Sequence, residues 1–133
     1  MWLLLIPPAV CSCQQADDKK TFSQLSWLLG TWEGEANGQP FYEQWVKEGE
    51  TAFANANFSL CNGDTLVNSR SRIELRNGKI AYTSGELTWE LTEISNTSCI
   101  FENTRYHEKF IFSISGNGDW IADLNYSNSS VKY

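Results

Sequence analysis

The stretch Leu25–Gly34, which reads LSWLLGTWEG, decides the fold of this chain. Its first part, Ser26-Trp27-Leu28-Leu29, places three large apolar side chains in a row, which suits a short helical turn that closes one end of a core. Gly30 frees the backbone to turn, and Thr31–Glu35 then alternates apolar with polar residues as a strand does. We therefore expect Trp32 to point inward near the start of the first strand. On alternation alone, the same stretch also fits an ordinary aromatic core strand.

The rest of the chain is a succession of short alternating segments separated by turn residues. After Thr31–Ala36, the predicted strands are Phe41–Lys47, Thr51–Cys61, Thr65–Arg76, Lys79–Gly85, Leu87–Ser95, Cys99–Asn103, Lys109–Ser115 and Asp119–Tyr126. Asn37-Gly38 and Asn77-Gly78 are signals for two-residue hairpins. A short helix is expected ahead of the first strand, capped by Thr21, with Phe22, Leu25 and Leu29 on one face.

Sequential hairpins of this kind indicate an all-β protein. About nine antiparallel strands without a crossover helix close most simply into an up-and-down barrel, because closure removes the exposed edges of the sheet. A β-sandwich is the alternative, but it normally needs longer Greek-key connections than the turns of this chain provide.

Aromatic residues are the expected interior of this barrel. We predict that Trp32, Trp45, Phe58, Trp89 and Trp120 line or fill it. In Thr51–Cys61, the predicted phase turns Phe58 inward together with Ala52, Ala54, Ala56 and Leu60. Small inward residues leave space that a ligand could occupy, or that a neighbouring indole, Trp32 or Trp45, already fills.

The opening of the first strand also carries a resemblance. Gly30-Thr31-Trp32 resembles the Gly-x-Trp signature of lipocalins and related calycin barrels. The chain is similar over most of Phe22–Tyr126 to domain of unknown function 6265, a mostly bacterial, lipocalin-like family. The similar segments are Leu25–Gly34, Glu43-Gln44-Trp45, Ser71–Gly78 (SRIELRNG) and Phe101-Glu102-Asn103 followed by His107. The resemblance implies a calycin- or lipocalin-like barrel of about 8–10 strands with a short N-terminal helix, and it implies no activity.

Length and charge limit the classes of partner. With 133 residues the chain amounts to one domain, long enough to bury a single core. Its net charge is −6, and its Lys and Arg residues are scattered, with no basic stripe. Nucleic acids and anionic membrane surfaces are therefore poor partners on electrostatic grounds. We interpret the acidity as favouring solubility, and we expect a monomer.

The N-terminal segment has the features of an export signal. Met1–Val10 (MWLLLIPPAV) is apolar and about as long as the hydrophobic part of a signal peptide, but too short to span a bilayer. Val10-Cys11-Ser12-Cys13 resembles the bacterial lipobox, in which Cys13 would take a diacylglycerol. We therefore expect a lipoprotein of the bacterial cell envelope that faces the periplasm or the exterior, with an ordinary secreted protein as the alternative. Its expected parts are a signal peptide (1–12), a tether (13–20), the barrel domain (21–126) and a polar tail (127–133).

Two cysteines remain in the expected mature domain, Cys61 and Cys99. A disulfide between them is compatible with an oxidising compartment, and a buried free thiol is equally compatible. The sequence has no Cys-x-x-Cys motif and a single histidine, so we expect no zinc site.

Polar candidates for a ligand site come from one segment and one strand. Glu102, Asn103 and His107 could meet at the barrel mouth as contacts for a ligand head group; alternatively they form a loop whose side chains satisfy backbone donors. Arg72 would need an anionic partner if it faced inward and would be a solvated surface charge if it faced outward. Because Ile73 and Leu75 occupy the other face, the outward orientation is favoured.

The leading functional hypothesis is a barrel that binds a small, largely apolar molecule. The sequence has no Gly-x-Ser-x-Gly elbow and no phosphate-binding glycine loop, so we expect neither an enzyme nor a cofactor. One alternative is an envelope interaction module that exposes aromatic rings around Tyr106, Phe110 and Phe112. Another is haem binding of the nitrobindin type, a second Gly-x-Trp barrel family, which would require His107 to face the cavity.

Overall fold

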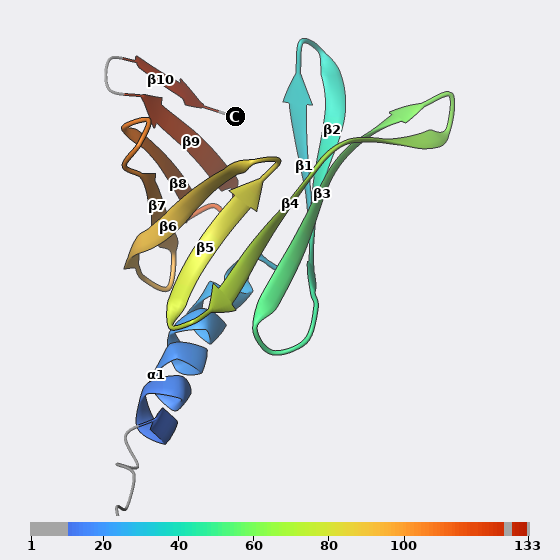
Figure 1. Ribbon diagram of the computed structural model, residues 1–133. Helices are drawn as coiled ribbons and strands as arrows, with labels where there is room; N and C mark the ends of the chain where they lie inside the picture. The colour runs from blue at the N-terminus through green and yellow to red at the C-terminus, as the bar shows by residue number, and fades with distance from the viewer. Residues whose placement is uncertain (1–10, 127–128, 133) are drawn as a thin grey trace, which may run out of the picture.

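The computed structural model describes residues 11–126 and 129–132, most of which form one curled antiparallel sheet (Figure 1). The helix α1 (Cys11–Ser23) and the 3-10 helix η1 (Gln24–Leu28) precede ten strands. The strands are β1 (Gly30–Ala36), β2 (Gln39–Lys47), β3 (Ala52–Cys61), β4 (Asp64–Arg76), β5 (Lys79–Ser84), β6 (Leu87–Ile94), β7 (Ser98–Asn103), β8 (Glu108–Ile114), β9 (Trp120–Tyr126) and β10 (Ser129–Lys132). Each strand pairs with the next one along the chain, which gives the up-and-down order that the hairpin signals predict.

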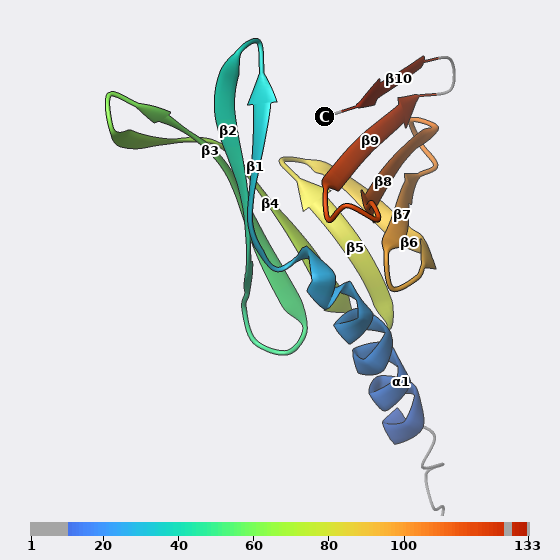
Figure 2. The ribbon, with the colours of Figure 1, turned by 180° about the vertical axis from the view of Figure 1, so that it is seen from behind.

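The barrel is nearly closed, and its two flanks meet through side chains. In the part of the chain that the structure describes, the ladder runs from β1 to β10 without a pairing between β1 and β9. Trp32 of β1 and Trp120 of β9 stack across this seam, with their ring centroids 6.5 Å apart. Figures 1 and 2 show β1–β2 and β9–β10 as facing flanks. The structure thus confirms the predicted all-β, calycin-like barrel.

Two of its hairpins follow directly from local sequence. Asn37 and Gly38 have φ angles of 54° and 74°, and Asn77 and Gly78 have φ angles of 53° and 75°. Two successive positive φ angles define the turn whose twist matches that of the flanking strands, and Asn-Gly is its preferred sequence. Both predicted hairpins are confirmed.

The N-terminal helix is longer than predicted. Gln14–Lys20, expected to be an unstructured tether, belongs to α1, because Gln, Ala and Lys are good helix formers. Thr21 lies inside this helix and donates to the carbonyl of Asp17 over 3.0 Å, so it is not the cap. An ion pair of 3.5 Å joins Lys19 of α1 to Glu50 in the β2–β3 turn.

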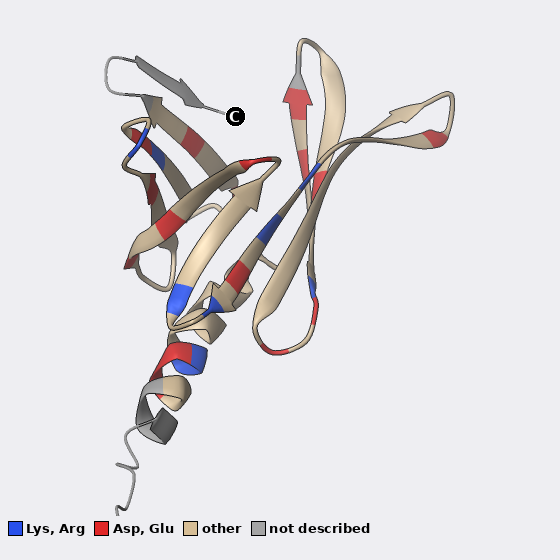
Figure 3. Ribbon diagram, in the orientation of Figure 1, with Lys and Arg blue, Asp and Glu red and all other residues tan. Residues whose placement is uncertain are grey.

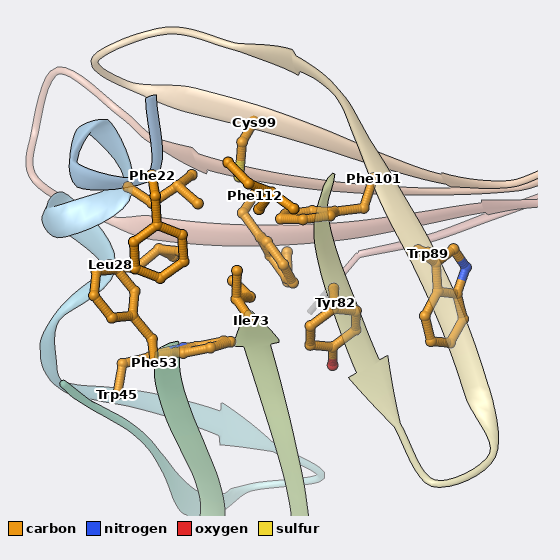
Figure 4. Packing of buried hydrophobic residues seen from close by; sticks show 13 residues of the cluster. Phe22, Leu28, Trp45, Phe53, Ile73, Tyr82, Trp89, Cys99, Phe101 and Phe112 are labelled. Carbon is orange, nitrogen blue, oxygen red and sulfur yellow. The ribbon is translucent and has the colours of Figure 1, made fainter. Parts of the chain in front are cut away.

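The end of α1 and η1 close one end of the core, as Figure 4 shows for Phe22 and Leu28. Phe22, Leu25 and Leu28 are essentially inaccessible to solvent, whereas Leu29, predicted on the same face, is only partly buried. The difference arises because side chains three residues apart align in a 3-10 helix, which turns Leu25 and Leu28 to the same side.

The predicted phase of β3 is wrong. Phe53 and Asn55 are 1% and 6% exposed, while Ala54 and Ala56 lie on the outer face. The cause is Phe53, which packs on Phe22 with ring centroids 4.6 Å apart. Burying one phenyl ring removes more apolar surface from water than burying two alanine methyl groups, so the aromatic residue sets the phase.

The C-terminal segment also differs from its prediction. Within the predicted polar tail, Ser129–Lys132 forms β10, which pairs Val131 with Leu124 of β9. A further strand satisfies backbone groups that the edge of β9 would otherwise leave unpaired. Residues 1–10, on which most of the predicted signal peptide falls, lie outside the described residues. None of the described helices is both long and apolar enough to cross a membrane.

The two cysteines of the barrel are free thiols. Cys61 is exposed at the end of β3, and Cys99 is fully buried in β7. Burial raises the pKa of Cys99 to about 12. The structure thus has the free thiols and not the disulfide between Cys61 and Cys99.

Candidate functional site

A cavity of about 400 Å³ lies inside the barrel. Its aromatic lining consists of Phe41, Trp45, Tyr82, Phe110, Phe112 and Trp120. Its polar lining consists of Glu43, Asn55, Asn57, Asn68, Ser69, Ser71 and Ser84. Ala122 of β9 is the one small apolar residue among them. Alternation places these side chains inside, because every second residue of a strand points to the same face.

The polar lining forms a connected network, which we call the polar ladder: Glu43, Asn55, Asn57, Asn68 and Ser71. Asn55 Nδ2 donates to Glu43 Oε2 over 2.7 Å, and Asn57 Nδ2 donates to Glu43 Oε1 over 2.8 Å. Asn68 Nδ2 donates to Asn57 Oδ1 over 3.0 Å, and Ser71 Oγ donates to Asn55 Oδ1 over 3.0 Å. The links among Glu43, Asn55, Asn57 and Ser71 are partly buried and satisfy polar groups that would otherwise be costly to bury, whereas the link to Asn68 is exposed.

Strand register assembles this ladder. Glu43 of β2 lies opposite Asn57 of β3, and Asn55 of β3 lies opposite Ser71 of β4. The register of β3 against β4 shifts after Asn57, which turns Asn68 toward the same face. Such a bulge inserts an extra residue and re-aims the side chains around it.

Two indole groups of the lining have no hydrogen-bond partner. Nε1 of Trp45 and Nε1 of Trp120 are buried, and neither has an acceptor among the described residues. Trp45 is only 3% exposed. A buried donor without a partner costs about 1–3 kcal/mol. Nε1 of Trp27 and Nε1 of Trp89, which lie outside this lining, are in the same state.

Tyr82 supplies a neutral phenol to the same cavity. Burial raises its pKa above the ordinary value, and hydrogen bonding with Ser71 and Ser84 opposes this shift. The hydroxyl therefore stays protonated at neutral pH, where it can both donate and accept a hydrogen bond.

The cavity continues toward the seam between β1 and β9. A second hollow of about 430 Å³ shares Phe41, Glu43 and Trp120 with it. We call this second hollow the mouth. Its further lining comprises Thr31, Trp32, Glu33, Gly34, Glu35, Gly118 and Asp119. The incomplete closure of the barrel thus provides the cavity with a route to solvent.

The five aromatic residues predicted for the interior occupy different places. Trp45 and Trp120 line the cavity, and Trp32 lines the mouth. Trp89 is 3% exposed and packs in the core without lining either hollow. The prediction for Phe58 is wrong, because β3 has the opposite phase from the one predicted. Phe58 lies outside the cavity lining and stacks on Tyr42, with ring centroids 5.1 Å apart.

Arg72 faces outward, in the orientation that the flanking residues favour. It pairs with Glu48 and with Glu74, whose Oε2 lies 3.0 Å from Arg72 Nε. Ile73, the next residue, is fully buried, so alternation turns Arg72 to the outer face. Arg72 is therefore not a ligand contact within the cavity.

The Glu102–His107 segment also lies away from the cavity. Glu102 pairs with Lys109 over 3.0 Å, and this hydrogen bond lowers the pKa of the carboxyl. Asn103 Oδ1 accepts from the backbone N–H of Tyr106 over 3.2 Å, as in the interpretation that these side chains satisfy backbone donors, and its Nδ2 donates to the carbonyl of Thr88 over 2.9 Å. His107 is exposed in the β7–β8 turn with a φ of 52°. The three residues line a separate hollow of about 370 Å³.

The places of these aromatic residues and of His107 bear on the two alternative functions, an envelope interaction module and haem binding. Phe110 and Phe112 line the cavity, and only Tyr106 is exposed, so the outer aromatic patch of the interaction hypothesis does not form from them. His107 does not line the cavity, so the geometry required for nitrobindin-like haem binding is not met.

Sequence reasoning missed the polar ladder because it selected residues by charge and by aromatic character. One signal was available. Asn55 and Asn57 alternate with alanines in a segment that reads as a strand, and asparagine is depleted in strands. Two asparagines at a spacing of two indicate a polar stripe on one face.

Comparison with known proteins adds no relative to this description. The chain matches no family model, and no curated protein or solved structure is significantly similar to it.

Proposed function

We propose that the barrel binds a small, largely apolar molecule in its cavity. The observation that carries this proposal is the lining itself. Six aromatic side chains and a hydrogen-bonded polar ladder surround about 400 Å³. Ligand pockets combine these features: they are mostly apolar, they measure about 300–1,000 Å³, and a few placed polar groups orient the ligand.

A simple packing defect explains this lining less well. Protein interiors are normally filled to the density of organic crystals, and large voids lose both contacts and hydrophobic stabilisation. A bound molecule would fill the space and restore these contacts.

Blocking the cavity tests the proposal. N-phenyl-1-naphthylamine, a neutral probe whose emission rises in apolar surroundings, should bind the wild-type chain. Ala122→Phe should weaken this binding at least tenfold, because a phenyl ring on β9 would occupy the space next to Trp120. The measurement is a fluorescence titration, with circular dichroism to check that the variant folds.

Ala56→Phe is the matched control for this titration. Ala56 lies on the outer face of β3, so its replacement adds the same ring without filling the cavity. Binding should stay within twofold of the wild type. Absence of probe binding by the wild-type chain, or equal binding by the Ala122→Phe variant, would refute the proposed function.

We further propose that the chain is a lipocalin-like, exported lipoprotein anchored through Cys13. The Gly30-Thr31-Trp32 signature, which resembles that of lipocalins, supports the first part. Val10-Cys11-Ser12-Cys13, with its likeness to a lipobox, supports the second. The direction of α1 is favourable too, because its N-terminal end projects away from the barrel (Figure 2).

Intact-mass spectrometry of membrane fractions tests the anchor. Full chains expressed in a Gram-negative host should be cleaved before Cys13 and should carry the mass of a diacylglycerol. Cys13→Ala should abolish this modification, whereas Cys11→Ala, two residues away, should retain it. A modified Cys13→Ala chain, or an unmodified wild-type chain, would contradict the anchor without bearing on the cavity.

A further inference from the structure

Building on the proposed function, we infer that the ligand is an organic cation, an amine on an apolar body. Two features of the cavity and its mouth support this ligand class. They are the sign of the charges and the aromatic rings of the lining.

The charges around both hollows have one sign. Glu43 lines the cavity, and Glu33, Glu35 and Asp119 join it around the mouth. Among the described residues that line these two hollows there is no Lys, Arg or His. The strand β1 correspondingly carries acidic bands and no basic one (Figure 3). A cleft with charges of one sign and low-dielectric walls focuses its field on ligands of the opposite sign.

Aromatic rings surround the same space. Trp120 stacks between Trp32 and Phe112, with centroid separations of 6.5 and 5.7 Å and interplanar angles of 24° and 20°. The face of an indole or phenyl ring is its negative side and attracts a cation held within about 6 Å. Trp32 and Phe112 cover the faces of Trp120, so an alkylammonium group would meet the other rings of the lining beside the Glu43 carboxylate.

Glu43 is positioned to receive that group. The amides of Asn55 and Asn57 each hold one of its carboxylate oxygens, over 2.7 and 2.8 Å. A carboxylate offers about four acceptor positions, so these two hydrogen bonds orient Glu43 and leave acceptor capacity for an ammonium N–H.

The carboxylates around the cavity and the mouth suit a metal ion less well than an organic cation. Over the described part of the chain, no three His, Cys, Asp or Glu side chains come together as a group that could hold a metal ion. Negative charge spread around an aromatic cavity fits a bulky organic cation better than a metal ion, which requires converging oxygen ligands.

Isothermal titration with three matched probes tests this inference. The probes 2-(1-naphthyl)ethylamine, 2-(1-naphthyl)ethanol and 1-naphthylacetate carry the same ring with a positive, neutral or negative group at pH 7. We expect the wild-type chain to bind the amine at least tenfold more tightly than the alcohol, and to bind the acetate most weakly.

Two variants locate the effect. Glu43→Gln should weaken amine binding at least tenfold and change alcohol binding less than twofold. Glu86→Gln is the matched control, because it removes the same charge from the exposed β5–β6 turn and should leave all three affinities unchanged. If Glu43→Gln fails to fold, the order of the three probes on the wild-type chain decides the question alone.

The outcomes separate the two proposals. Equal binding of amine and alcohol, or tighter binding of the acetate, overturns the preference for a cation and leaves the proposed binding function intact. The preference for a cation is likewise overturned if N-phenyl-1-naphthylamine binds and none of the three matched probes does. Failure of N-phenyl-1-naphthylamine to bind refutes the binding function itself.

Discussion

Phe112→Ala is expected to lower the free energy of unfolding by about 3–5 kcal/mol. Phe112 is 2% exposed, and its ring contacts the rings of Trp45, Tyr82, Phe101, Phe110 and Trp120 at centroid separations of 5.2–6.2 Å. Figure 4 shows it among the labelled rings of the core. Truncation removes these contacts and enlarges an existing cavity, and the barrel wall is too constrained by hydrogen bonds to collapse onto the space.

Unfolding in guanidinium chloride measures this effect, and Phe58→Ala is its control. Phe58, like Phe112, is a phenylalanine in a strand. It stacks on a single aromatic ring, however, and lies partly exposed outside the cavity lining. Its truncation should cost about 1–2 kcal/mol, since less apolar surface is returned to water. Equal losses for the two variants would show that Phe112 is not the centre of the core.

The second large effect concerns alkaline pH. The wild-type chain should lose up to about 4 kcal/mol of its free energy of unfolding between about pH 9 and pH 12 through Cys99. Burial raises the pKa of this thiol from 9.0 to about 12, so the folded state retains the proton over a range in which the unfolded chain releases it. Stabilisation by this group is therefore complete below pH 9 and disappears as the pH approaches 12.

Two cysteine variants isolate this contribution. Compared with the wild type, Cys99→Ala should lose about 2 kcal/mol less between pH 8 and pH 10.5, because no buried thiol remains to ionise. Cys61→Ala is the matched control: it removes an exposed thiol and leaves Cys99 in place, so it should retain the loss that Cys99 causes. An identical profile for Cys99→Ala would contradict the assignment.

Local patterns were sufficient for much of the barrel. The Asn-Gly turns define their hairpins through backbone conformation alone, and Trp45 and Ile73 mark the inner faces of β2 and β4 because large apolar side chains alternate with polar ones there. The pattern failed in β3. Phe53 and Phe58 are five residues apart, an odd spacing that puts the two phenylalanines on opposite faces, and only packing against Phe22 chose between the two phases.

The candidate site was harder to predict for the same reason. Its polar ladder joins β2, β3 and β4, and no single segment contains enough of it to stand out. Glu43 and Asn55 are twelve residues apart, and their hydrogen bond exists because the β2–β3 register brings neighbouring positions together. Charged residues conspicuous in the sequence, such as Arg72 and Glu102, found partners on the outer surface instead.

By itself, the sequence determined an all-β chain of hairpins with an aromatic interior, since turn chemistry and alternation act over only a few residues. Tertiary structure decided which face of β3 is buried, which polar side chains share the cavity, and that the seam between β1 and β9 stays open beside it. These choices depend on the total surface buried and on register between distant strands. Both are properties of the assembled barrel, and neither is visible in a window of neighbouring residues.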